Sequence, residues 1–147
     1  EARRYIDSYF EKYSAVKEYL DSTVEKAERD GYVTTLYGRR RYIPELSAQK
    51  KPLRAFGKRV AMNTPIQGTA ADIIKIAMVR TEKALEEANI DAKLILQVHD
   101  ELLVEASKRD AACASEILKH EMENVASLAV PLSAELEVGD TWYDAHG

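Results

Sequence analysis

The residues best suited to chemistry lie in a short polar run, His99-Asp100-Glu101, between two apolar segments. Residues 93–98 and 101–106 have the pattern of two strands joined by His99 and Asp100. Two-residue hairpin turns favour Asn-Gly or Asp-Gly, because these residues accept a positive φ at little cost. His-Asp is a poor choice for the turn alone, so a functional interpretation competes with that of an ordinary polar hairpin tip.

A carboxylate held at a strand end suits a hard cation such as Mg²⁺. Two-metal phosphoryl chemistry needs at least two anchored acids around ions that lie about 4 Å apart. Glu101 directly follows Asp100, and neighbouring side chains on a strand point to opposite faces, so the two carboxylates need not converge. If Asp100 binds a catalytic metal, its partner acid lies outside these residues or on another chain.

A second group of polar residues, Arg59, Asn63 and Gln67, recurs at four-residue steps around Pro65. All three can present hydrogen-bonding groups to one surface, and Gly68 lets another backbone approach closely. Such side chains suit the DNA minor groove, whose acceptors scarcely distinguish A·T from T·A. Ordinary capping and hydrogen bonding between helices is the competing interpretation.

Charge is unevenly distributed along the 147 residues, of which 46% are hydrophobic and 31% are charged. Residues 39–59 hold eight Lys or Arg and one acid, and so carry +7. Since the whole chain carries −4, the remainder carries −11. A polyanion responds to local potential, so this basic segment can bind phosphates on an acidic protein, although a solvated basic loop explains the charge equally well.

Composition excludes several other classes of protein. A single cysteine, Cys113, rules out an intramolecular disulfide framework and is typical of a reducing compartment. Apolar stretches are only a few residues long, so no membrane span and no membrane partner are expected. A helical pattern begins at Ala2 without an N-cap, which predicts that further sequence precedes this chain.

The apolar periodicity predicts an α+β fold, with an antiparallel sheet and helices packed on one face. The helical pattern in the middle of the chain is expected to be interrupted at Thr64-Pro65, because the residue before a proline avoids the α region. Trp142 and Tyr143 are expected to close the core. The expected elements are one or two helices over residues 2–30 with a restart at Ser14, a basic hairpin over 32–43, helices over 53–63 and 65–88, a hairpin over 93–106, a helix over 107–127 and a strand over 132–138.

Two longer motifs resemble the C-terminal part of the family A DNA polymerases, the bacterial DNA polymerase I type. The motifs are TPIQGTAADIIK over residues 64–75 and QVHDEL over residues 97–102. Shorter stretches over residues 31–36, 38–41 and 130–132 are similar as well, so the resemblance covers essentially the whole chain.

The resemblance implies a fragment of the right-hand polymerase fold. Residues 1–62 would form the end of the fingers with connecting helices and the basic hairpin, and residues 63–147 would form part of the palm. The intact enzyme would extend a primer by nucleotidyl transfer from dNTPs with two Mg²⁺ ions. Asp100 would be one of two essential metal-binding aspartates, and Glu101 an auxiliary acid near the metals.

The resemblance also implies contacts to primer–template DNA. His99 would contact the primer terminus and take part in catalysis. The minor groove near that terminus would be followed by Arg59, Asn63 and Gln67, and Arg54 would touch the template.

Two parts of the family pattern do not occur in this sequence: the other metal-binding aspartate, and the helix that grips the incoming nucleotide. We therefore expect the isolated chain to be inactive, and to self-associate through an exposed sheet edge. The implied location is the bacterial cytoplasm, in association with the nucleoid. The alternative function is a non-catalytic module that binds duplex DNA through the basic segment, while the lack of a second convergent acid disfavours a nuclease.

Overall fold

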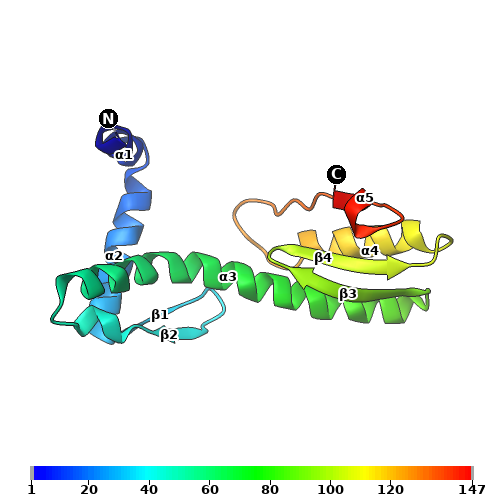
Figure 1. Ribbon diagram of the computed structural model, residues 1–147, viewed down its shortest axis with the longest axis horizontal. Helices are drawn as coiled ribbons and strands as arrows, with labels where there is room; N and C mark the ends of the chain where they lie inside the picture. Colours follow the sequence, from blue (N-terminus) through cyan, green and yellow to red (C-terminus); the bar gives the residue numbers. More distant parts are fainter. Residues whose placement is uncertain (1, 147) are drawn as a thin grey trace. The chain divides into compact units, whose positions relative to one another are not determined.

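The computed structural model describes residues 2–146 and divides into two compact units (Figure 1). The first unit runs up to Thr69 and the second begins at Ala70. A single helix, α3 (Lys51–Ala88), contributes to both units. Helices combine with two small antiparallel sheets, so the α+β class is confirmed, although each sheet is a two-stranded hairpin.

The first unit packs helices against a short hairpin. Its antiparallel strands pair Tyr32 with Tyr42 and Val33 with Arg41. The two-helix interpretation of residues 2–30 is confirmed, since the first helix ends at Lys12 and the next begins at Ser14. Its elements are α1 (Ala2–Lys12), α2 (Ser14–Asp30), β1 (Tyr32–Thr34), β2 (Arg40–Tyr42), η1 (Pro44–Ser47) and the first part of α3, and its buried core consists of Ala27, Val33, Ile43, Leu46 and Ala61.

The helix break expected at Pro65 is wrong, because α3 runs through this residue without interruption. Proline has no N–H for the carbonyl of Ala61, and this lost bond destabilises an isolated helix by roughly 3 kcal/mol. Contacts with the first unit offset the loss. Thr64 and Pro65 are buried, the hydroxyl of Thr69 donates to the Pro65 carbonyl, and Arg41 Nη1 lies 3.4 Å from Thr64 Oγ1.

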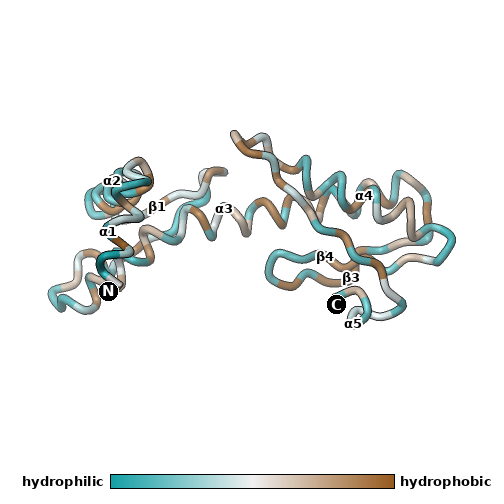
Figure 2. Tube along the Cα trace, turned by 90° about the horizontal axis from the view of Figure 1, so that it is seen from above, coloured by the Kyte–Doolittle hydropathy of each residue, from teal (hydrophilic) through white to brown (hydrophobic). Residues whose placement is uncertain are grey.

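The second unit is built around the hairpin of β3 (Ala92–Val98) and β4 (Glu101–Ala106). In Figures 1 and 2 this hairpin runs beside the second part of α3, with hydrophobic residues recurring along the strands. One hydrophobic core cluster contains Ala77 of α3 and Leu102 of β4, and Leu118 of α4 (Ala111–Glu123) packs against it. The helix α4 thus ends earlier than residue 127, the expected end.

Asp110 anchors the connection between β4 and α4. Its carboxylate accepts hydrogen bonds from the Ser107 hydroxyl at 3.0 Å and from the backbone N–H of Asp91 at 3.1 Å. The guanidinium of Arg109, which also donates to this carboxylate, is the largest cause that lowers the pKa of Asp110 to about 2. The expected helix start around residues 107–110 is therefore a compact turn that precedes α4.

The strand expected over residues 132–138 is not formed. Leu132, Ala134 and Leu136 are half-buried and alternate with exposed residues, but Val138 at the expected end of the strand is 66% exposed, so the predicted burial pattern is present only in part. A strand also needs a hydrogen-bonded partner, and no strand among residues 2–146 pairs with this segment. The backbone N–H of Ala134 instead donates to Glu123 Oε1 at 3.1 Å.

The last helix, α5 (Trp142–His146), lies at the surface of the second unit. Trp142 is 47% exposed and Tyr143 is 86% exposed, so the expectation that they close the core is wrong. Within residues 2–146, no helix combines the length and apolar character that a bilayer span requires.

Candidate functional site

The polar tip of the β3–β4 hairpin is formed as the sequence predicts. Val98 pairs with Glu101, which leaves His99 and Asp100 as the two residues of the turn. His99 has φ of 53°, and Asp100 has no positive φ. A positive φ at only the first turn residue is the sign pattern of a type II′ turn, in which glycine is preferred at that place. Histidine at this position stores backbone strain of about 1 kcal/mol.

Gln97 restrains this strained turn. Its Nε2 donates to the His99 carbonyl at 2.6 Å, and thereby orients the peptide that joins His99 to Asp100. No role of Gln97 is expected from the sequence pattern alone. A half-buried amide that follows the apolar run Leu94–Leu96 is the signal that marks it.

The candidate catalytic carboxylates are accessible to ligands. Asp100 and His99 are exposed, and the side chain of Glu101 is 44% exposed. The next residue, Leu102, is 8% exposed and belongs to the core of the second unit. Burial of Leu102 therefore anchors a tip whose polar groups face solvent.

A complete metal site is not present in the described part of the chain. No group of three His, Cys, Asp or Glu residues within residues 2–146 lies close enough together to hold a metal ion. Asp100 and Glu101 are adjacent on the hairpin, and they do not form such a group with a third acid or histidine. These residues alone do not fit a pair of metal ions, so they can supply only part of a coordination shell.

Arg59, Asn63 and Gln67 occupy one exposed face of α3. Because the helix is uninterrupted, each four-residue step turns the side chain by only about 40°. The continuous helix thus aligns these side chains more directly than the two helices expected from the sequence. The guanidinium of Arg59 also lies 5.8 Å from the centre of the Phe56 ring.

Gly68 allows the loop after β1 to pack tightly against α3, beside Gln67. A Cβ atom on Gly68 would lie 2.7 Å from Thr35 Cγ2, a distance at which a neighbour must move. The Gly68 carbonyl accepts a hydrogen bond from Arg39 Nη2 at 3.0 Å, and Thr69 Oγ1 accepts one from the Leu36 N–H at 2.9 Å. The close approach expected at Gly68 is made by the loop after β1, and its nearest atom is the side-chain methyl of Thr35.

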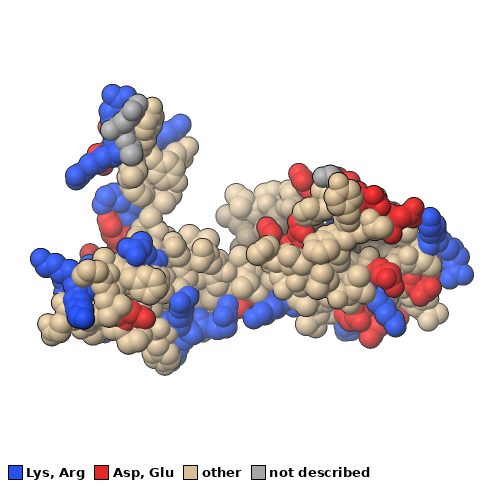
Figure 3. All heavy atoms as spheres, viewed as in Figure 1, with Lys and Arg blue, Asp and Glu red and all other residues tan. Residues whose placement is uncertain are grey.

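Several cations of the basic segment have structural partners in the first unit. Arg41 contacts Thr64, Arg40 lies 5.0 Å from the centre of the Tyr32 ring, and Lys58 Nζ lies 2.9 Å from Glu28 Oε1. In contrast, no ion pair is found between another described residue and the exposed side chains of Lys50, Lys51 and Arg54. In Figure 3, lysines and arginines predominate on the first unit and acids on the second, which also carries a basic group at its outer end. The cations available to a polyanion are therefore fewer than the charge count implies.

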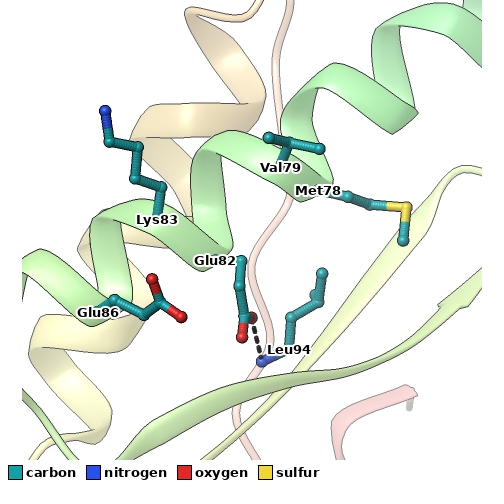
Figure 4. Close-up of a pocket in the computed structure, with 6 residues that line it drawn as sticks. All are labelled: Met78, Val79, Glu82, Lys83, Glu86 and Leu94. Carbon is teal, nitrogen blue, oxygen red and sulfur yellow. Dashed lines mark hydrogen bonds between the residues drawn. The ribbon is translucent and has the colours of Figure 1, made fainter.

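The second unit also contains a hollow of about 490 Å³ between α3 and β3 (Figure 4). Its lining includes Met78, Val79 and Leu94, together with Glu82 and Glu86. The Glu82 carboxylate accepts a hydrogen bond from the backbone N–H of Leu94 at 3.3 Å. No predicted site residue lines this hollow, so we assign it no part in the candidate site.

Comparison with known proteins decides the family. The family model described as DNA polymerase family A matches residues 1–144. The chain belongs to DNA polymerase family A. DNA polymerase I of Caldicellulosiruptor bescii is 49% identical over 144 residues, and that of Bacillus subtilis (strain 168) is 48% identical over 145 residues. These alignments cover 98% and 99% of this chain but only 17% and 16% of the relatives.

A solved structure supports the same assignment and the fold. The POL domain of Pol1 from M. smegmatis, in complex with DNA primer-template and dNTP, matches with a TM-score of 0.96 and 39% sequence identity. The match covers 100% of this family A chain and 26% of that chain. The fold expected from the resemblance, a fragment of a polymerase domain, is thus confirmed.

The strained turn makes a testable prediction. His99→Gly should raise the free energy of unfolding by about 1 kcal/mol, because glycine adopts a positive φ without a clash. Asp100→Gly is the matched control and should not stabilise the chain, since Asp100 has no positive φ. Urea unfolding of the two variants measures the difference, and equal destabilisation by both would show that His99 is unstrained.

Proposed function

We propose that this chain acts as part of a template-directed DNA polymerase that extends a primer by nucleotidyl transfer from dNTPs. The observation that carries the proposal is the exposed Asp100 carboxylate at the tip of a well-anchored hairpin, in a chain of DNA polymerase family A. In this proposal residues 1–62 belong to the fingers and residues 63–147 to the palm. Primer–template DNA and a dNTP are its partners, and the bacterial cytoplasm around the nucleoid is its location.

We assign metal binding to Asp100, with Glu101 as an auxiliary acid. Two Mg²⁺ ions at such a site would activate the primer hydroxyl and stabilise the negative charge on the oxygens around the reacting phosphorus. The hairpin supports this assignment because it holds the Asp100 carboxylate in solvent on a rigid element. In this proposal the second anchoring acid comes from outside residues 2–146, where no group of three acids, histidines or cysteines lies close enough together to hold a metal ion.

We assign DNA contacts to the exposed face of α3 and to the hairpin tip. Arg59, Asn63 and Gln67 share a face of one helix, and their donors match the acceptors that all base pairs present in the minor groove. His99 is assigned to the primer terminus and Arg54 to the template. These contacts sense duplex shape, and the template strand supplies the sequence information.

The isolated chain should not incorporate nucleotides. It contributes one side of a metal site, and the nucleotide-gripping helix of the family pattern does not occur in its sequence. Activity requires the chain within a full-length polymerase, and the experiments on catalysis below use that protein.

The central test replaces Asp100 by Ala in the full-length polymerase that carries this chain. Because Asp100 is assigned to the metals and not to the duplex, single-turnover incorporation should fall at least about a thousandfold. The dissociation constant for primer–template should change less than about threefold. Rapid-quench kinetics and fluorescence anisotropy measure the two quantities on the same DNA.

Arg59→Ala is the matched variant on the other surface, and its pattern should be the reverse. It should weaken primer–template binding severalfold through the loss of minor-groove contacts, with a smaller effect on the rate at saturating DNA.

Full incorporation by Asp100→Ala would contradict the assignment of Asp100 as a metal ligand. A wild-type protein that binds duplex DNA with a steep salt dependence, but never extends a primer, would favour the alternative of a non-catalytic binding module.

We also propose that the isolated chain self-associates through the outer edge of β3. Ile95 is 55% exposed and Leu96 is 43% exposed on this strand, and the sheet has only two strands. An unpaired edge with apolar side chains favours pairing with another chain. The Leu94 N–H already donates a hydrogen bond to the Glu82 carboxylate, so association should involve the part of β3 that follows Leu94.

Sedimentation velocity of the isolated chain tests this association. The average mass should rise with concentration, and Ile95→Lys should reduce the rise because a lysine on an edge strand opposes pairing. A strictly monomeric wild-type chain at high concentration would disprove it.

A further inference from the structure

A second segment reaches the candidate site from the far end of the chain. Residues 139–146, here called the α5 segment, fold back on themselves before they approach β4. The Thr141 hydroxyl donates to the Asp144 carboxylate at 2.6 Å and accepts a hydrogen bond from the Asp144 N–H at 3.2 Å. A Cβ atom on Gly139 would lie 2.6 Å from the Ala145 nitrogen, so only glycine permits this close return.

The α5 segment is attached near both ends of β4. At its start, Asp140 Oδ1 lies 2.8 Å from Lys108 Nζ, two residues beyond the end of β4. At its end, His146 Nδ1 lies 3.7 Å from Oε1 of Glu101, the first residue of β4. Figure 1 shows α5 (red) beside the β3–β4 hairpin. Two side-chain contacts therefore link the folded α5 segment to the strand that presents the candidate carboxylates.

The imidazole of His146 is itself held in place. Its ring packs edge-on against Trp142, with 6.2 Å between the ring centres. Within residues 2–146, the His146 imidazole is the one basic side chain found within 4 Å of the Glu101 carboxylate, and the contact is an ion pair when His146 carries a proton. A half-exposed glutamate without such a neighbour samples many rotamers, so this contact restricts where the Glu101 carboxylate lies.

We propose that His146 is a positioning residue for Glu101, and that the folded α5 segment holds His146 beside Glu101. The proposal rests on the proposed polymerase function, in which Glu101 is an auxiliary acid. His146 need not touch DNA, nucleotide or metal for this role. It acts by restricting the positions that the Glu101 carboxylate can take at the hairpin tip.

The test compares variants of the full-length polymerase that carries this chain. His146→Ala should lower kcat about three- to fivefold, the size expected from the loss of one surface contact, and should leave the KM for dNTP unchanged. His146→Gln, which keeps a polar side chain of similar reach, should restore part of the loss. Tyr143→Ala is the matched control, because Tyr143 lies on the same helix, is 86% exposed, and should not change kcat.

A double-mutant cycle separates positioning from general support of the fold. Glu101 is assigned as an auxiliary acid, so Glu101→Ala should leave a measurable rate. In that background His146→Ala should have no further effect, since the group it positions is gone. A full effect of His146→Ala without Glu101, or no effect with Glu101 present, would overturn the proposal.

Hydrogen exchange gives a readout that does not depend on catalysis. His146→Ala should speed exchange at the start of β4, and Tyr143→Ala should not. If the wild-type protein fails to extend primers, the proposed function fails. Exchange then decides separately whether His146 restrains the hairpin tip, and unchanged exchange in His146→Ala rejects that contact.

Discussion

The register of the β3–β4 hairpin is the constraint on which the candidate site depends. Side chains alternate along a strand, so a slip of one residue would exchange buried and exposed positions. Leu102 is buried in the core, and the pairing of Val98 with Glu101 leaves His99 and Asp100 outside the ladder. Hydrophobic burial of one residue therefore sets the position of an exposed carboxylate two residues away. The hydrogen bond from Gln97 to the His99 carbonyl then restricts the turn itself.

A comparable constraint shapes the first unit, where the loop after β1 is tied to α3. Hydrogen bonds from Arg39 to the Gly68 carbonyl and from the Leu36 N–H to Thr69 hold the helix around Pro65. The helix stays continuous, and its polar face stays in one line. Several cations of the basic segment thus make contacts that stabilise the fold, and only the remaining cations are available to bind a polyanion.

The sequence predicted those features that depend on local pattern. Alternating apolar residues and a polar pair located the β3–β4 hairpin, and helical periodicity located the restart at Ser14. The break at Pro65 was wrong because partners about 30 residues away in sequence support the helix there. The strand over residues 132–138 was wrong because alternation predicts burial but cannot supply a hydrogen-bonded partner. The contact of His146 with Glu101 depends on how the chain returns, which no local pattern records.

Whether the hairpin tip lies beside the catalytic metals can be measured directly. Fe²⁺ that replaces Mg²⁺ in the full-length polymerase, bound to primer–template and dNTP, cleaves nearby backbone when ascorbate and hydrogen peroxide are added. If Asp100 is a metal ligand, cleavage should centre on residues 99–101, excess Mg²⁺ should suppress it, and Asp100→Ala should abolish it. Cleavage confined to other parts of the protein, with none at the tip, would contradict the assignment of Asp100 as a metal ligand.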